Sequence, residues 1–115
     1  MKTKSMMLVV VLLLFSLTSL FAMTAKTEKI KVYGNCGQCK TRIEKAAKSV
    51  DGVSQATWNG KNKILTVTFD STKTTTMKIE DAIAKVGHDT ENMKATDKAY
   101  NALPGCCKYD RPATK

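Results

Sequence analysis

The chain has 115 residues, enough for one small domain with short extensions but not for several domains. It is basic, with a formal net charge of +9, yet its few aromatic residues are not interleaved with its lysines as a nucleic-acid stacking platform requires. We therefore expect no nucleic acid partner. We expect the positive charge to keep the protein soluble or to steer it toward an acidic partner.

The first predicted element is a signal peptide in residues 1–22. Lys2 and Lys4 form a charged start, residues 6–20 are a nearly unbroken apolar run, and Ala22 offers a small residue for cleavage. The alternative is an uncleaved membrane anchor, although the run is close to the shortest length that spans a bilayer, about 17 residues. The sequence thus predicts a periplasmic or secreted protein that meets the membrane only through this segment.

Strands and helices alternate along the rest of the chain. Strand positions show alternating apolar residues, and both main helices have one apolar stripe. In order, we predict a strand at 28–33, a helix at 37–50, strands at 53–58 and 63–69 joined by an Asn59-Gly60 turn, a helix at 76–86, a weak strand at 90–95 and a short helix at 97–103.

This order predicts an α+β fold of the ferredoxin-like βαββαβ type. Strand–helix–strand units cross right-handed, which gives a four-stranded antiparallel sheet with both helices on one face. The domain would span residues 23–95, and residues 96–115 would form a C-terminal extension that carries a Cys-Cys pair.

The central motif is the thiol pair Cys36 and Cys39, placed where the first helix begins. A helix N-terminus carries partial positive charge, which lowers the pKa of a thiol. Thiolates are soft ligands that select ions such as Cu(I) and Zn(II). Two protein ligands leave a bound ion open to attack by the thiols of a partner, which suits transfer better than storage.

The same layout is also that of a thiol–disulfide oxidoreductase, which is the alternative function. The predicted strand order does not fit a thioredoxin fold. The prolines, Pro104 and Pro112, are also badly placed to lie opposite the thiols.

His88 is a third candidate ligand. In the predicted fold the end of the first strand and the start of the fourth share one edge of the sheet, so His88 should lie near the two thiols. Neutral imidazole is a good copper ligand. The alternative is an exposed histidine in a turn.

Cys106 and Cys107 could also reach the site. The predicted helix at 97–103 rises about 1.5 Å per residue and could return the chain roughly 10 Å toward the thiol loop. The pair would then add metal ligands, form a second site, or form disulfides with Cys36 and Cys39. The alternative is a vicinal disulfide or two free thiols on a mobile tail.

Residues 28–94 resemble the heavy-metal-associated domain, found in copper metallochaperones, copper-transporting ATPases and periplasmic mercury-binding proteins. The shared features begin with the first strand and the apolar helix. The shared motifs are, in chain order, Cys36-x-x-Cys39, the turn Asp51-Gly52-Val53, Leu65-Thr66-Val67 with Phe69-Asp70, and Ile79-Glu80-Asp81-Ala82-Ile83 before Gly87. The resemblance implies that Cys36 and Cys39 are the metal ligands.

The chain departs from the usual pattern of that family in three places. The family commonly has a methionine where this chain has Gly34, and an aromatic residue or lysine where it has His88. It does not require the tail that carries Cys106 and Cys107.

We therefore predict an exported carrier or scavenger of Cu(I), with Hg(II), Ag(I) and Zn(II) as the other candidate ions. A partner thiolate would attack the two-coordinate ion, and a three-coordinate intermediate would pass it on. The expected partner is an acidic-faced protein such as a domain of a metal transporter. No substrate bond is broken, so the predicted protein is not an enzyme.

Overall fold

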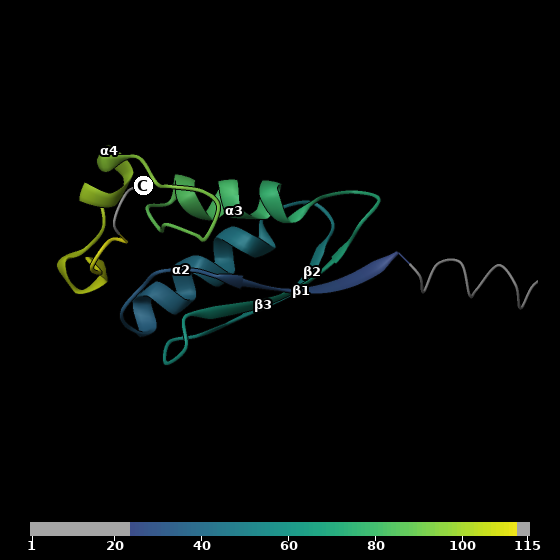
Figure 1. Ribbon diagram of the computed structural model, residues 1–115, viewed down its shortest axis with the longest axis horizontal. Helices are drawn as coiled ribbons and strands as arrows, with labels where there is room; N and C mark the ends of the chain where they lie inside the picture. The colour runs from purple at the N-terminus through teal and green to yellow at the C-terminus, as the bar shows by residue number, and fades with distance from the viewer. Residues whose placement is uncertain (1–23, 113–115) are drawn as a thin grey trace, which may run out of the picture.

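The computed structural model describes residues 24–112, so the predicted signal peptide at 1–22 lies outside the described residues. Strands β1 (Ala25–Lys31), β2 (Val53–Asn59) and β3 (Ile64–Asp70) form an antiparallel sheet in the order β1-β3-β2. Helices α2 (Gly37–Lys48) and α3 (Thr76–Lys85) lie together on one face of it (Figure 1). Within residues 24–112 we find no helix that is long and apolar enough to cross a membrane.

Local sequence accounts for the two main helices. The buried stripe of α2 comprises Cys39, Ile43, Ala46 and Ala47, at the spacing that puts side chains on one helical face. The side chain of Thr75 caps α3 by accepting a hydrogen bond from the backbone N–H of Lys78. The two helices therefore begin where the sequence predicts, and each ends one or two residues earlier than predicted.

The fourth predicted strand, at 90–95, is corrected by the structure. Within residues 24–112 it is reduced to one antiparallel bridge between Val32 and Thr90, beside the outer edge of β1. The chain then turns, because the N–H of Thr90 donates to the carbonyl of Met93 at 2.8 Å. The buried carboxylate of Glu80 accepts hydrogen bonds from the hydroxyl of Thr90 and the N–H of Asn92, which holds this turn against α3.

The C-terminal extension folds back onto the domain. Helix α4 (Asp97–Asn101) confirms the short predicted helix, and the 3-10 helix η1 (Gly105–Cys107) follows it. Both lie at the end of the molecule where α2 begins (Figure 1). Leu103, Cys107 and Tyr109 are buried and belong to the same apolar core as the sheet and α2. The extension is thus packed, and it brings the second cysteine pair to the first.

Candidate metal centre

Cys36 and Cys39 lie at the N-terminus of α2. Cys36 occupies the N-cap position, and its carbonyl accepts the first helical hydrogen bond, from the N–H of Lys40 at 3.1 Å. Cys39 lies one turn inside the helix and is fully buried, whereas Cys36 is half-buried. Their Sγ atoms are 3.8 Å apart. The predicted pair is therefore brought together as two neighbouring sulfurs, one of them in reach of solvent.

The start of the helix favours the thiolate of Cys36. The backbone N–H of Cys39 is the main cause, with a smaller effect from that of Gln38, and together they lower the pKa of Cys36 to about 7. These N–H groups face the sulfur without making a capping hydrogen bond. Their partial positive charge is the helix-terminus effect that activates cysteines.

Gly34 lies beneath the thiol loop in a crowded position. A Cβ atom placed on Gly34 would come within 3.1 Å of Cβ of Cys39, 3.1 Å of the Trp58 ring and 3.2 Å of Ile43. The indole N–H of Trp58 donates to the carbonyl of Val32 at 3.0 Å. The large Trp58 side chain thus occupies the space next to the loop, and glycine is the residue that leaves room for it.

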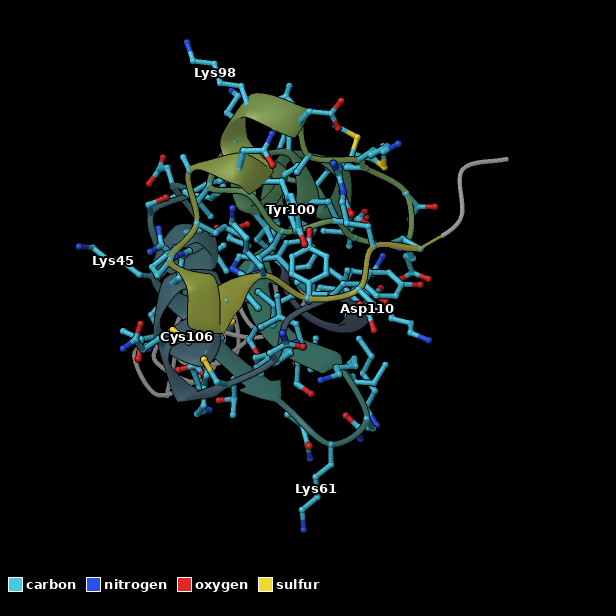
Figure 2. All side chains as sticks on the ribbon, turned by 90° about the vertical axis from the view of Figure 1, so that its left-hand side faces the viewer. Lys45, Lys61, Lys98, Tyr100, Cys106 and Asp110 are labelled. Carbon is cyan, nitrogen blue, oxygen red and sulfur yellow. The ribbon has the colours of Figure 1, made fainter. Side chains whose placement is uncertain are left out.

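The extension places Cys107 and Cys106 beside this loop. Sγ of Cys107 is 3.9 Å from Sγ of Cys36 and 3.9 Å from Sγ of Cys106. The ligand atoms of Cys36, Cys106 and Cys107 all lie within 4.8 Å of one another. Cys107 is fully buried, while Cys106 is exposed on the face that Figure 2 turns to the viewer. All four thiols therefore gather at one end of α2, a donor set suited to a soft metal ion.

Two hydrogen bonds hold the extension to the thiol loop, one from the cysteine pair itself and one to the residue after it. The side-chain amide of Asn35 donates to the carbonyl of Lys108 at 3.0 Å, and the thiol of Cys106 donates to Oε1 of Gln38 at 3.1 Å. Burial is the main cause that raises the pKa of Cys107 far above its ordinary range. Burial therefore favours the neutral thiol of Cys107 over its thiolate.

His88 lies in the interior, next to the thiol loop along the backbone but outside the cluster of sulfurs. Its Nδ1 is 2.8 Å from the carbonyl oxygen of Tyr33, and because a carbonyl only accepts, Nδ1 carries the proton. Its Nε2 is buried and has no hydrogen-bond partner among residues 24–112. Burial lowers the pKa of His88, which keeps the ring neutral at neutral pH. The ring stacks on Tyr109 at a centroid distance of 5.4 Å.

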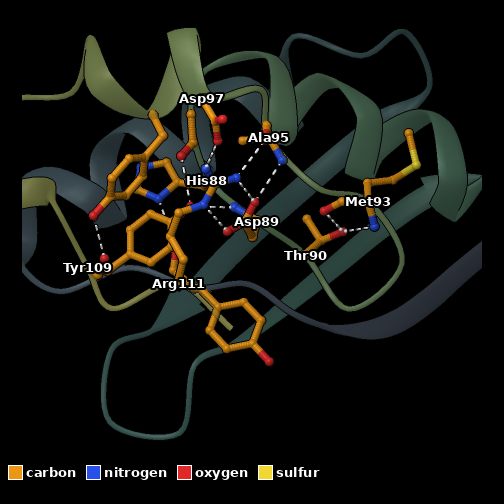
Figure 3. A network of polar contacts seen from close by, with 11 residues as sticks. His88, Asp89, Thr90, Met93, Ala95, Asp97, Tyr109 and Arg111 are labelled. Carbon is orange, nitrogen blue, oxygen red and sulfur yellow. Dashed lines mark hydrogen bonds and ion pairs between the residues drawn. The ribbon is translucent and has the colours of Figure 1, made fainter. Parts of the chain in front are cut away.

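A polar network anchors the end of the extension (Figure 3). The guanidinium of Arg111 donates to both carboxylate oxygens of Asp89 at 2.9 Å and to Asp97 at 2.7 Å. Burial would raise the pKa of Asp89, but hydrogen bonds from Arg111 and from the N–H of Ala95 outweigh it and lower that pKa. The hydroxyl of Tyr109 accepts from the N–H of Asp89 and donates to the carbonyl of Gly87.

Sequence reasoning did not identify Tyr109, Arg111 or Asp89 as residues that build the site. Tyr109 and Arg111 stand in a segment of mixed polar residues with no periodicity. The one signal in the sequence was that Tyr109 and Arg111 follow the cysteine pair closely. An aromatic residue and an arginine at such positions can pack a C-terminal segment against a domain.

Comparison with known proteins identifies the domain that contains Cys36 and Cys39. The model of the heavy-metal-associated domain matches residues 35–89. The mercuric transport protein periplasmic component of Shewanella putrefaciens is 43% identical over 77 residues, which cover 65% of this chain and 85% of that protein. The copper chaperone CopZ of Staphylococcus aureus (strain JH9) is 36% identical over 55 residues, which cover 48% of this chain and 81% of that protein.

A solved structure shares its fold with part of this chain. Oxidized MerP from Ralstonia metallidurans CH34 aligns with a TM-score of 0.56 at 31% identity, covering 58% of this chain and 94% of that one. The domain of this chain that contains the CxxC loop shares its fold with that structure and with the other matched structures. The chain belongs to the heavy-metal-associated domain family.

Proposed function

We propose that this protein carries a soft metal ion on Cys36 and Cys39 and passes it to a partner by thiolate exchange. The observation that carries the proposal is the pair of sulfurs 3.8 Å apart at the N-terminus of α2, one buried and one half-buried. The buried thiol retains the ion, and the accessible one is where an incoming thiol can replace a ligand. The family relatives named above are a copper chaperone and a mercuric transport component, which supports a carrier and not an enzyme.

We propose Cu(I) as the cargo, with Hg(II) as the second candidate and Ag(I) and Zn(II) after them. A donor set made of thiolates favours Cu(I) and similar soft ions. The relative that covers more of this chain is named for mercury, which is the observation that favours Hg(II). Competition between the two ions for the reduced protein decides between them.

Transfer would proceed in steps that keep the ion bound throughout. Each cysteine thiol that binds the ion releases its proton to solvent. A thiolate of the partner then forms a new metal–sulfur bond as the bond to the accessible Cys36 breaks, and a second partner thiolate replaces Cys39 last. Each released cysteine thiolate takes a proton from solvent. The partial positive charge at the start of α2 offsets part of the negative charge on the thiolates.

Export and partner choice are part of the same proposal. A cleaved signal peptide at 1–22 would place the domain at 23–95 and the extension at 96–115 in the periplasm or outside the cell. Cleavage would remove Lys2 and Lys4 and lower the formal charge from +9 to +7, which still suits an acidic partner such as a domain of a metal transporter.

The test is a Cu(I) competition titration and metal analysis on the reduced protein. The wild-type chain should bind Cu(I) tightly, and Cys36→Ser/Cys39→Ser should lose that binding. Lys61→Ser, on the exposed β2–β3 turn, is the matched control and should bind as wild type does. Efficient reduction of insulin disulfides without tight metal binding would instead support the oxidoreductase alternative and overturn the carrier proposal.

The ligand role predicted for His88 is tested in the same titration. Its Nε2 carries the free lone pair of a neutral ring, which is the form that binds copper. His88→Asn can keep a side-chain N–H toward the carbonyl of Tyr33 while it removes Nε2. If His88 is a ligand, this variant lowers Cu(I) affinity and changes the metal spectra. Unchanged affinity and spectra would reject that role.

A further inference from the structure

The extension brings a third sulfur to the pair that holds the ion in the proposed function. Cys107 is fully buried and points its Sγ to within 3.9 Å of Sγ of Cys36, which is itself 3.8 Å from Sγ of Cys39. The pairing spans 71 positions of sequence, so it results from the fold and not from a local motif. Cys106, next in the chain, remains exposed.

The spacing of these sulfurs matches a coordination number above two. With a metal–sulfur distance of about 2.3 Å, two thiolates on opposite sides of an ion lie about 4.6 Å apart, three in a trigonal plane about 4.0 Å, and four in a tetrahedron about 3.8 Å. The separations of 3.8 Å and 3.9 Å around Cys36 fall in the range for three or four ligands. Cys107 therefore lies close enough to Cys36 to share an ion that Cys36 binds.

The extension is held in this position by contacts that do not involve the sulfurs. Asn35 binds the carbonyl of Lys108 directly after the pair. Tyr109 bridges Asp89 and Gly87, and Arg111 forms an ion pair with Asp89. Because these anchors involve no sulfur atom, they can order the extension independently of metal binding, which lowers the entropy that binding would cost.

We propose that Cys107 is the third thiolate ligand of the cargo ion and that Cys106 is the exposed thiol at which exchange with a partner begins. The proposal rests on the proposed function, because it adds ligands to the same ion. The cargo class is a soft ion that accepts three thiolates, such as Cu(I) or Hg(II).

The two tail thiols therefore have different roles. On binding, the thiol of Cys107 loses its proton to solvent and forms the third metal–sulfur bond. The bound ion is then covered by the extension. For transfer, the thiol of Cys106 loses its proton to solvent and binds the ion as the bond to Cys107 breaks, and the Cys107 thiolate takes a proton from solvent. A partner thiolate then displaces Cys106 at the surface, and partner thiolates replace Cys36 and finally Cys39, each released thiolate taking a proton from solvent.

The deciding measurement is X-ray absorption at the copper edge of the reduced wild-type protein loaded with one Cu(I). Three sulfur ligands are expected. Cys107→Ala should show two and should bind Cu(I) at least tenfold more weakly, while Cys106→Ala should keep three sulfurs and near wild-type affinity. Circular dichroism of each variant checks the fold. Three sulfurs in Cys106→Ala assign the third ligand to Cys107 even if Cys107→Ala unfolds, because Cys107 is then the one thiol left besides Cys36 and Cys39.

Kinetics test the role of Cys106. Removal of Cu(I) by an excess of a small thiol should be several-fold slower in Cys106→Ala than in wild type, and several-fold faster in Cys107→Ala. Two sulfur ligands in the wild-type spectrum, or an unchanged removal rate in Cys106→Ala, would overturn the corresponding assignment. These outcomes leave the carrier proposal intact, since that proposal fails if Cys36→Ser/Cys39→Ser still binds Cu(I) as the wild type does, or if the wild type reduces insulin without binding Cu(I) tightly.

Discussion

Gly34 and Trp58 share one space under the thiol loop. The family commonly has a methionine at the glycine position, whereas here the ring of Trp58 is 3.1 Å from where a Cβ atom would lie. The indole is anchored by its hydrogen bond to Val32, so it cannot easily move away. The small residue and the large one therefore replace the usual packing of the loop as a pair.

This pairing makes Gly34→Ala a destabilising change. The added methyl group must push on Cys39, Ile43 or the Trp58 ring, and overpacking of this kind costs about 1–3 kcal/mol of unfolding free energy. Gly37→Ala is the matched control, because a Cβ atom on Gly37 has no neighbouring atom within 4 Å and lies in the first turn of α2. Urea unfolding measures both. Equal stability of the two variants would contradict the proposed crowding.

The hydroxyl of Tyr109 is a second group whose contribution to the free energy of unfolding can be measured. It satisfies the N–H of Asp89 at 2.8 Å and the carbonyl of Gly87 at 2.9 Å, both in the interior. Tyr109→Phe leaves both groups unpaired, and we expect it to lower the unfolding free energy by about 2–3 kcal/mol.

Tyr100→Phe provides the comparison for this prediction. Its hydroxyl makes one partly buried hydrogen bond, to the carbonyl of Tyr109, so its loss should cost about 1 kcal/mol. A smaller effect of Tyr109→Phe than of Tyr100→Phe in thermal or urea unfolding would show that the two backbone groups find other partners.

At the scale of elements, the C-terminal extension is joined to the domain by the ion pair of Arg111 and Asp89. The Asp89 carboxylate is buried and the Arg111 side chain is 17% exposed. Arg111→Leu keeps the volume of the stem and removes the charge. We expect it to cost about 3 kcal/mol at pH 7, the lower end of the range for breaking a buried pair.

The effect of Arg111→Leu should depend on pH in a defined direction. The folded pKa of Asp89 is lowered, so the pair's contribution is fully present above the ordinary pKa of about 3.9 and is lost as pH falls through the lowered folded value. The gap in unfolding free energy between wild type and variant should therefore narrow at low pH, where both proteins carry a neutral Asp89.

Urea unfolding from pH 7 to about pH 2 measures this gap, because the folded pKa of Asp89 lies below its ordinary value. Lys85→Leu, which breaks the exposed pair with Asp81, is the control and should change stability by less than about 1 kcal/mol. A gap that stays constant over this pH range would show that Arg111 stabilises the extension through packing alone, including its contact with the ring of Tyr100.

For the whole molecule, the positive charge should act on the rate at which partners reach the site. Steering by net charge weakens as salt screens it, over a Debye length of about 30 Å at 0.01 M and about 10 Å at 0.1 M. We expect removal of the bound ion by the anionic thiol mercaptosuccinate to slow several-fold as salt rises across this range. Removal by the cationic thiol cysteamine should instead stay constant or become faster.

Stopped-flow exchange with the two thiols tests this sign difference, and uncharged 2-mercaptoethanol is the control whose rate should not depend on salt. The same salt dependence for all three thiols would mean that the charge of +9 serves solubility and not recognition.

The sequence by itself determined the features that depend on neighbouring residues. The periodicity of α2 and α3, the turn after β2 and the placement of Cys36 and Cys39 at a helix start all follow from contacts within a few positions. Such contacts leave a pattern of apolar residues, caps and glycines that can be read directly. The family resemblance followed from the same pattern and is confirmed by the comparisons.

Only the tertiary structure decided how the distant segments meet. The hydrogen bonds from Glu80 turn the chain after Thr90, so the predicted fourth strand shrinks to one bridge. The position of Cys107 depends on contacts such as Asn35 with Lys108, 73 positions apart. An apolar or polar pattern reports which face of a segment is buried but not which partner covers it. For that reason the sequence suggested that the second cysteine pair could reach the first, and the fold placed it there.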